Sequence, residues 1–241
     1  MKKFYHLVAV NHYPEGYAVL LDAKPIRTPQ GQLLLCPNED LANAVMGEWV
    51  AQVETIKPDT MPITQLVTTY LDKVQGQREI LQPEVMNFLD TDLLCYRAGD
   101  PPAFAARQEM VWDPVLSWFQ DSFSVKVQTT TELAALRQDP QVHQSVETYV
   151  RNLSDAYFSI LQIVTAETGS LLLAIAFLEK AVTPQDAFNA AQAEELLKSE
   201  IYNEEFYGKA PDIEKKQAHL LLTLQAARRF LDTFGDSYSQ E

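Results

Sequence analysis

The side chains of this sequence whose types and spacing could support chemistry fall into two acidic groups. In the first group, Asp90 and Asp92 flank Thr91, and carboxylates at this spacing could ligate a cation or act as an acid–base pair. An Asp-Thr-Asp sequence at the end of a helix is more typical of a cap followed by a turn. We therefore expect Asp92 to be structural. A metal- or acid/base-dependent enzyme that uses Asp90, Asp92 and the carboxylates around Glu200 is the alternative function.

The second group is an acidic segment, residues 194–214, in which seven acidic residues and two lysines give a net charge of −5. Tyr202, Phe206 and Tyr207 are interleaved with these charges. A solvated helix face would explain the pattern, but aromatic residues inside a charged rim are typical of protein-binding surfaces, and acidic ones attract basic partners. We predict that this segment contacts a partner through Glu200, Asn203, Glu204, Glu205 and Tyr207.

The sequence lacks the motifs that usually hold a nucleotide, a metal or a catalytic nucleophile. It contains neither of the glycine-rich phosphate loops, no His-Glu-x-x-His and no Gly-x-Ser-x-Gly, and its four histidines are scattered. Cys36 and Cys95 are too few and too unpatterned for a disulfide framework or a zinc site, which favours two reduced thiols in a reducing compartment. We therefore expect no cofactor, no metal and no enzymatic activity.

The elements that would position these residues begin with a small sheet. Residues 4–10 and 16–22 read as strands joined by a turn, and residues 26–28 and 33–36 as short extended pieces. Asn38 is a suitable cap for a helix that should end near Lys57, because Pro58 disfavours helix at the residue before it. A second helix with an apolar stripe, residues 63–74, would complete a hairpin. We expect Trp49 to be structural, where the first helix meets the sheet or the second domain.

The remainder of the chain reads as helices. We expect them over residues 77–89, 104–119 (with a new helix starting at Asp113-Pro114), 143–153, 156–178, from residue 187 to Gly208, and 212–234, with Thr183 to Asp186 as a capping box. Trp112 is expected to be structural. The sequence therefore predicts an α+β protein, with a small N-terminal α/β domain that contains an antiparallel sheet (residues 1–92) and an all-helical C-terminal domain (residues 93–241).

The overall composition limits the class of protein. The 241 residues carry a net charge of −14, which argues against binding to nucleic acid or to an anionic membrane, since both need a basic face. No stretch reaches the roughly 18 uninterrupted apolar residues of a membrane span. The first residues lack the longer apolar core of a signal peptide. We expect a soluble, intracellular protein that is a monomer when free.

Several blocks in order resemble the Atp12 family of F1-ATPase assembly chaperones. Glu48-Trp49-x-x-Gln52 is the most distinctive of them. The others are Gly16 to Gly31, Lys57 to Leu66, Asp90 to Ala98, Gln108 with Trp112 to Trp118, and Thr165 to Ala176. The block at residues 200–208 departs from the family pattern Glu-x-x-Gln-x-Glu-x-Trp-Gly, because Asn203 and Tyr207 replace its Gln and Trp.

The resemblance implies an assembly chaperone that holds the new α subunit of F1 until it joins the β subunit, without a nucleotide. It also implies a small α/β N-terminal domain and a helical C-terminal domain. Because eukaryotic members carry a presequence and this chain starts at its first strand, it is similar to a bacterial, cytoplasmic member. A processed eukaryotic form would instead work in the mitochondrial matrix. In either case we expect Trp49→Arg to cost roughly 3–5 kcal/mol of stability.

Overall fold

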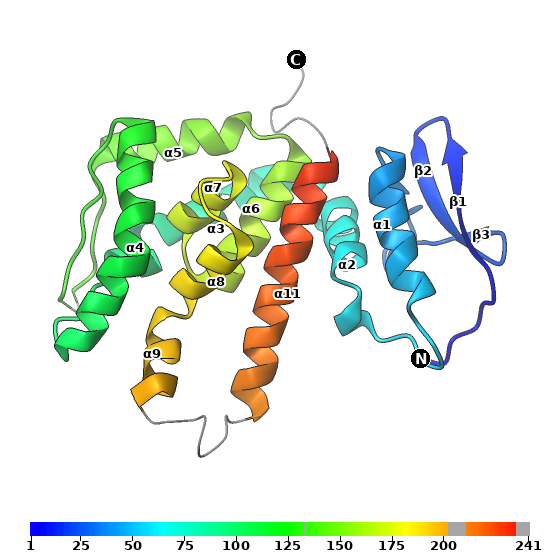
Figure 1. Ribbon diagram of the computed structural model, residues 1–241. Coiled ribbons are helices and arrows are strands. Elements are labelled where there is room, and N and C mark those ends of the chain that lie inside the picture. The colour runs from blue at the N-terminus through cyan, green and yellow to red at the C-terminus, as the bar shows by residue number, and fades with distance from the viewer. Residues whose placement is uncertain (133, 202–210, 235–241) are drawn as a thin grey trace. The chain divides into compact units, whose positions relative to one another are not determined.

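The structure is a computed structural model, and it describes residues 1–132, 134–201 and 211–234 (Figure 1). The contacts within the chain group it into two compact units. The N-terminal unit comprises Met1–Glu79, Leu153–Ile160 and Ala226–Glu241, and the helical unit comprises Ile80–Asn152 and Leu161–Gln225. The predicted boundary at residue 92 stays a prediction. Within the described residues, no helix combines the length and the apolar character needed to cross a membrane.

The sheet of the N-terminal unit is built around its second strand. Strands β1 (Val8–Tyr13) and β2 (Gly16–Leu21) form an antiparallel hairpin, and the short strands β3 (Lys24–Pro25) and β4 (Leu35–Cys36) also pair with β2. Gly16 has φ +143°, and a Cβ there would lie 2.5 Å from the carbonyl oxygen of Cys36, so only glycine fits. The predicted antiparallel sheet is confirmed, as is the fold class.

The first strand begins later than predicted. The prediction placed its start at Phe4, but β1 begins at Val8. The reason lies in Asp22, whose carboxylate accepts the backbone N–H groups of His6 (3.0 Å) and Leu7 (2.8 Å). A side chain therefore takes the hydrogen bonds that a neighbouring strand would otherwise supply.

The helical hairpin of this unit comprises α1 (Glu39–Val50), a 3₁₀ turn (Pro58–Thr60), α2 (Pro62–Thr69) and a π turn (Tyr70–Val74). The predicted cap is confirmed, because the Asn38 side chain accepts the N–H of Leu41 at 2.9 Å. The predicted helix end near Lys57 is wrong. Residues 54–56 instead pair with the first residues of the chain through a Lys2–Thr55 bridge, so the helix ends at Val50 and Val53 is 80% exposed.

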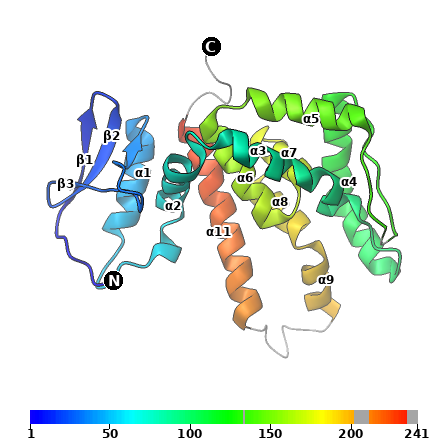
Figure 2. The ribbon, with the colours of Figure 1, turned by 180° about the vertical axis from the view of Figure 1, so that it is seen from behind.

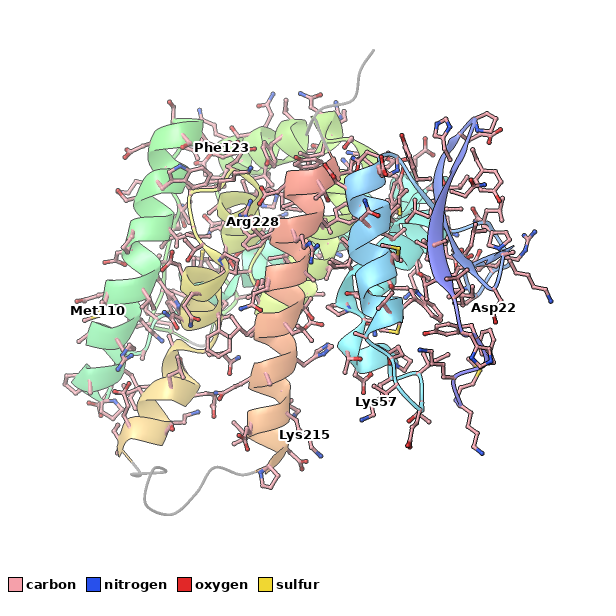
Figure 3. The ribbon with its side chains drawn as sticks, turned by 45° about the vertical axis from the view of Figure 1, so that its right-hand side comes forward. Asp22, Lys57, Met110, Phe123, Lys215 and Arg228 are labelled. Atoms are coloured by element: carbon pink, nitrogen blue, oxygen red, sulfur yellow. The ribbon has the colours of Figure 1, made fainter. Side chains whose placement is uncertain are left out.

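The N-terminal unit also contains parts of two helices that come much later in the sequence. They are the first turns of α6 (Asp155–Thr168) and the last turns of α11 (Pro211–Phe234). The Tyr157 hydroxyl donates to the carbonyl of Leu231 at 3.3 Å, and the Asn38 amide donates to the carbonyl of Thr233. The ring of Tyr70 meets that of Phe234 edge-on at 5.6 Å. Figure 3 shows the side chains of this unit around α1.

The described part of the helical unit consists mainly of helices, with two 3₁₀ turns and a non-helical stretch in which Thr130 forms a parallel bridge with Tyr96. Its elements, which can be followed from behind in Figure 2, are α3 (Arg78–Met86), the turns Asn87–Thr91 and Leu93–Cys95, α4 (Pro102–Phe123), α5 (Pro140–Asn152), the remainder of α6 and α11, α7 (Leu171–Leu178), α8 (Pro184–Ala191) and α9 (Ala193–Ile201). The predicted capping box at Thr183 and Asp186 is confirmed. All eight side chains of α7 are buried, which makes this helix the centre of the core.

Three predictions about helix boundaries in this unit are wrong. The helix predicted from residue 187 to Gly208 is interrupted at Gln192, where α8 ends and α9 follows. The helix α4 continues through Pro114, because Pro114 lies on an exposed side where water can bond to the carbonyl of Met110 that loses its partner. Met110 is itself 72% exposed (Figure 3). The predicted single helix over residues 156–178 is two helices, since Gly169 has φ +72° and Ser170 caps a new helix by accepting the N–H of Leu173.

Candidate partner-binding surface

Helix α4 holds α8 and α9 in place through side chains on one of its faces. The indole N–H of Trp112 donates to the carbonyl of Ala190 at 2.8 Å, and Trp112 is almost completely buried. The amide of Gln108 donates to the carboxylate of Glu194 at 2.8 Å and accepts the backbone N–H of Ala98 at 2.7 Å. Because Gln108 is buried and bonded at both ends, it fixes the position of Glu194 on α9.

Arg107, next to Gln108 on α4, pairs with Glu200. One guanidinium nitrogen donates to both carboxylate oxygens, at 2.7 and 2.5 Å. Lys198, two residues before Glu200 on α9, pairs with Glu195 at 2.6 Å. The side chain of Glu200 remains 57% exposed, so its carboxylate is held in place while most of it faces solvent.

A polar cleft of about 310 Å³ lies beside these residues in the helical unit. Its lining includes Arg97, Gln108, Glu109, Asp113 and two threonines. The guanidinium of Arg97 donates to Asp113 at 2.5 Å and lies over the ring of Trp112, 5.3 Å from its centroid. The cleft is therefore rich in charged groups, with the carboxylates of Glu109 and Asp113 on its exposed side.

We call these charged residues together the α4–α9 surface. Its members are Arg97, Arg107, Glu109, Asp113, Glu194, Glu195, Lys198 and Glu200. The acidic members outnumber the basic ones, and each basic member is already engaged by a carboxylate of the same surface. A surface of this charge is complementary to basic groups, and the carboxylates of Asp113, Glu194, Glu195 and Glu200 are held in place by ion pairs or hydrogen bonds.

Four of the five residues predicted to contact a partner, Asn203, Glu204, Glu205 and Tyr207, lie outside the described residues. Arg107 was missed by the sequence analysis, and no local pattern could have revealed it, because it lies 93 residues from Glu200 in the sequence. Gln108 entered only through the family resemblance.

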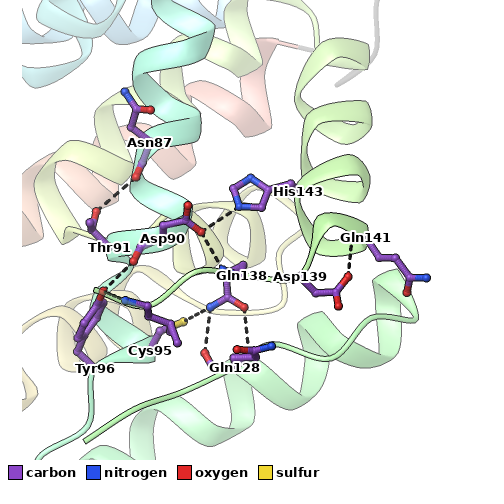
Figure 4. Close-up of polar contacts among 11 residues, drawn as sticks. Asn87, Asp90, Thr91, Cys95, Tyr96, Gln128, Gln138, Asp139, Gln141 and His143 are labelled. Carbon is purple, nitrogen blue, oxygen red and sulfur yellow. Dashed lines mark hydrogen bonds and ion pairs between the residues drawn. The ribbon is translucent and has the colours of Figure 1, made fainter. Parts of the chain in front are cut away.

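The two aspartates of the alternative, enzymatic function do not share a site. Asp90 accepts the backbone N–H of Gln138 and contacts the imidazole of His143, both at 2.9 Å (Figure 4). Asp92 is completely buried and accepts the Ser170 hydroxyl at 2.6 Å and the backbone N–H of Leu172 at 2.9 Å. Burial raises the pKa of Asp92 to about 6, although these donors and the N–H of Leu94 lower it. One aspartate thus joins a surface network and the other caps buried helices.

The same network contains a cysteine, but as a packed thiol. The amide of Gln138 contacts the sulfur of Cys95 at 3.4 Å and donates to the carbonyl of Gln128 at 2.9 Å (Figure 4). Burial raises the pKa of the Cys95 thiol well above its ordinary value, and that of Cys36 to about 12. Both thiols are therefore protonated at neutral pH. Over residues 1–132, 134–201 and 211–234, no three His, Cys, Asp or Glu side chains are grouped as metal ligands would be.

Glu48 and Gln52 of the Glu48-Trp49-x-x-Gln52 sequence connect α1 to the segments that follow it. The carboxylate of Glu48 accepts the N–H groups of Ile63 and Thr64, both at 2.7 Å, and so caps α2. Gln52 is buried, and its side chain accepts the N–H of Lys57 at 2.8 Å. Burial raises the pKa of Glu48, and the N–H and hydroxyl donors partly oppose this shift. These two polar residues hold α1, the following turn and α2 together.

Trp49 lies on another side of α1, where its ring meets that of Tyr5 at a centroid distance of 5.7 Å. The Tyr5 hydroxyl also donates to the backbone carbonyl of Trp49 at 2.7 Å. The indole N–H of Trp49 is buried and finds no acceptor among the described residues. The structure therefore places this ring between α1 and the segment that leads into the sheet.

A small antiparallel sheet and a helical unit with a charged surface on α4 and α9 define an α+β protein. A family model described as ATP12 chaperone protein matches residues 2–120. The chain is similar to Atp12 from Paracoccus denitrificans (29% identity, 96% of this chain and 97% of that one, TM-score 0.82). A point variant of that protein gives 28% identity, the same coverage of both chains and a TM-score of 0.81.

A third solved structure, of a candidate chaperone from Agrobacterium tumefaciens, is 30% identical to the chain. The match covers 97% of this chain and 86% of the Agrobacterium tumefaciens chain, with a TM-score of 0.85. The chain belongs to the ATP12 chaperone family. Its fold supports a role as an assembly chaperone.

Proposed function

We propose that the protein binds the newly made α subunit of F1 ATP synthase before that subunit joins the β subunit, and that it does so without catalysing a reaction. Membership of the ATP12 family is the observation that carries this proposal. The family resemblance implies the α subunit as the partner. We place the function in the bacterial cytoplasm, or in the mitochondrial matrix if the chain is a processed eukaryotic protein.

We further propose that Glu200 and the rest of the α4–α9 surface contact the α subunit. F1 subunits meet one another through interfaces that include arginines, and a chaperone could cover such a surface in place of the absent neighbour. A carboxylate has about four acceptor positions, and the bond from Arg107 leaves room for a second guanidinium on Glu200. Because Arg107 already fixes the carboxylate, a partner would lose little side-chain freedom on binding it.

A binding titration of the full chain with isolated F1 α and β subunits tests this proposal. We expect binding to α, and we expect Glu200→Lys to weaken it by about 2 kcal/mol or more, which is roughly 30-fold in Kd. The fold should survive, because an exposed ion pair contributes only ~0–1 kcal/mol. Circular dichroism of the same samples checks that point.

Arg107→Gln is the matched control, since it removes the same ion pair but keeps the carboxylate of Glu200. We expect it to bind α more weakly than the wild type but clearly more tightly than Glu200→Lys, because the carboxylate stays and loses only its fixed position. If Arg107→Gln weakens binding as much as Glu200→Lys does, Glu200 acts by positioning α9 and does not touch the partner. Normal binding by Glu200→Lys would remove this face from the site, and a wild-type protein that ignores α would refute the proposal itself.

A further inference from the structure

The N-terminal unit contains an apolar cleft of its own, of about 480 Å³. This volume lies within the range of sites that bind small ligands or one or two large side chains. Aromatic and aliphatic side chains form most of its lining, and charged ones stand beside them. The lining residues are Met1, Phe4, Tyr5, Leu21, Asp22, Lys24, Pro25, Ile26, Arg27 and Trp49.

Phe4 is the exposed wall of this cleft. The residue is 61% exposed, although its ring meets the ring of Tyr5 edge-on at 5.5 Å. The backbone on both sides of Phe4 is fixed, because the N–H of Lys3 donates to the carbonyl of Glu54 at 2.9 Å and the N–H of His6 donates to Asp22. The ring is therefore presented on an ordered segment. Met1, which lines the same cleft, is 76% exposed, so the exposed apolar surface comprises more than one residue and favours an interaction site.

The charged residues at the mouth of the cleft indicate the charge of a complementary partner. Lys24 and Arg27 are exposed there, and Asp22 is the acidic side chain of the lining. The carboxylate of Asp22 is already engaged, since the N–H groups of Leu7 and His6 bond to it and lower its pKa. The mouth therefore presents net positive charge in a protein whose total charge is −14.

An adjoining cleft extends the positive surface. It is about 530 Å³, shares Tyr5 with the first cleft, and is lined also by Lys2, Lys3, His6 and Glu54. The ammonium of Lys3 bonds to the carbonyl of Gln52 at 2.9 Å and lies over the ring of Tyr5. Basic side chains thus stand on more than one side of the apolar cleft. A peptide with carboxylates on both sides of an apolar residue would complement it.

We propose that this cleft binds an extended segment of the client protein in which a large apolar side chain lies between carboxylates. The apolar side chain enters between Phe4 and Trp49, and its acidic neighbours meet Lys24 and Arg27. The identity of the client rests on the proposed function, but the chemistry of the segment does not. The protein would hold its client through an apolar anchor here and through its own carboxylates on α9.

Two synthetic peptides test the cleft directly by fluorescence anisotropy with the full chain. One carries a Leu-Phe pair between aspartates, and in the other lysines replace the aspartates. We expect the acidic peptide to bind and the basic one not to bind. Phe4→Asp and Lys24→Glu should each weaken binding of the acidic peptide by about tenfold or more.

Two exposed residues of the same unit give matched controls. Leu7→Asp changes a side chain that is 65% exposed on the same segment but does not line the cleft, and Lys73→Glu reverses an exposed charge on the π turn. Both should bind the acidic peptide like the wild type. The inference is overturned if neither peptide binds, if both bind equally, or if the controls lose as much affinity as the test variants.

Sedimentation of the free protein and a titration with the α subunit complete the test. Self-association that Phe4→Asp abolishes would mean that the occupant is a second copy of the chain, which also overturns the inference. If the wild type binds the acidic peptide selectively but does not bind α, the proposed function fails and the cleft stands. If α binds Phe4→Asp and Lys24→Glu as tightly as the wild type while the acidic peptide does not, the client does not use the cleft and the proposal is overturned.

Discussion

Two opposing effects act on the pKa of the buried Asp92 carboxyl, and the pH dependence of protein stability shows which of them is larger. Its oxygens accept the Ser170 hydroxyl and the N–H groups of Leu94 and Leu172, so it caps the Leu93–Cys95 turn and is bonded to the first turn of α7. These donors favour the ionised form, whereas complete burial favours the protonated form. Burial prevails, with a folded-state pKa of about 6 against an ordinary value of 3.8.

The sign and size of the effect follow from this difference. Below about pH 4 the carboxyl is protonated in both the folded and the unfolded protein. Between about pH 4 and about pH 6 the folded state keeps a proton that the unfolded state has lost, so the contribution of Asp92 to the free energy of unfolding falls as the pH rises. A shift of about 2 pKa units corresponds to roughly 3 kcal/mol, and the loss is complete above about pH 6.

Urea unfolding of the wild type and of Asp92→Asn, at pH 4, 5, 6 and 7.5, measures this contribution. The asparagine is nearly isosteric and does not titrate, and subtracting the two free energies cancels the other groups. We expect the stability of the wild type relative to Asp92→Asn to fall by about 2.5 kcal/mol from pH 4 to pH 7.5, because the unfolded carboxyl is already partly ionised at pH 4. A difference that is constant or rises with pH would show that the hydrogen bonds outweigh burial, and would refute the reasoning.

Three further predictions concern the N-terminal unit and ligands. Trp49→Arg should lower the free energy of unfolding by about 3 kcal/mol, because it replaces a largely covered ring with a charged side chain. Trp49→Phe should cost less, since the N–H that it removes has no acceptor among the described residues. Equal melting temperatures for Trp49→Arg and the wild type would contradict this prediction. Glu48→Ala should cost about 2 kcal/mol in urea unfolding, because it uncaps α2, whereas an unchanged midpoint would show that the cap contributes nothing. Calorimetric titration with ATP, Mg²⁺ or Zn²⁺ should give no heat beyond dilution, and saturable micromolar binding would favour the enzymatic alternative.

The fold could be predicted wherever a local signal acts alone. Asn38 and the Thr183–Asp186 capping box start helices by bonding to N–H groups within three residues, so their sequence patterns were sufficient. The end of α1 could not be predicted in this way, because residues 54–56 pair with residues 1–3. The start of α7 likewise depends on Asp92, 78 residues earlier. Some errors in the predicted boundaries therefore fall where distant segments meet, whereas the break predicted at Pro114 was wrong because that proline lies on an exposed side of α4.

In the candidate site, too, local patterns pointed to individual residues but did not predict their contacts with distant segments. Glu200 could be selected from its acidic and aromatic surroundings, and the family resemblance drew attention to Gln108. The ion pair of Glu200 with Arg107 and the bond of Gln108 to Glu194 join α4 to α9 across some 90 residues of sequence, and no spacing rule predicts them. The sequence indicated which residues to consider, and the structure showed which of them are held in place by distant parts of the chain.

The N-terminal unit has a consequence for how the protein is made. Its sheet and hairpin precede some of their partners in the sequence, and these partners include Tyr157 and the last turns of α11, where Leu231, Thr233 and Phe234 make contacts within the unit. A ribosome would deliver those turns long after it has made the sheet. The sheet and the hairpin therefore remain without these contacts until α11 is made, and a product truncated before residue 226 would lack them altogether.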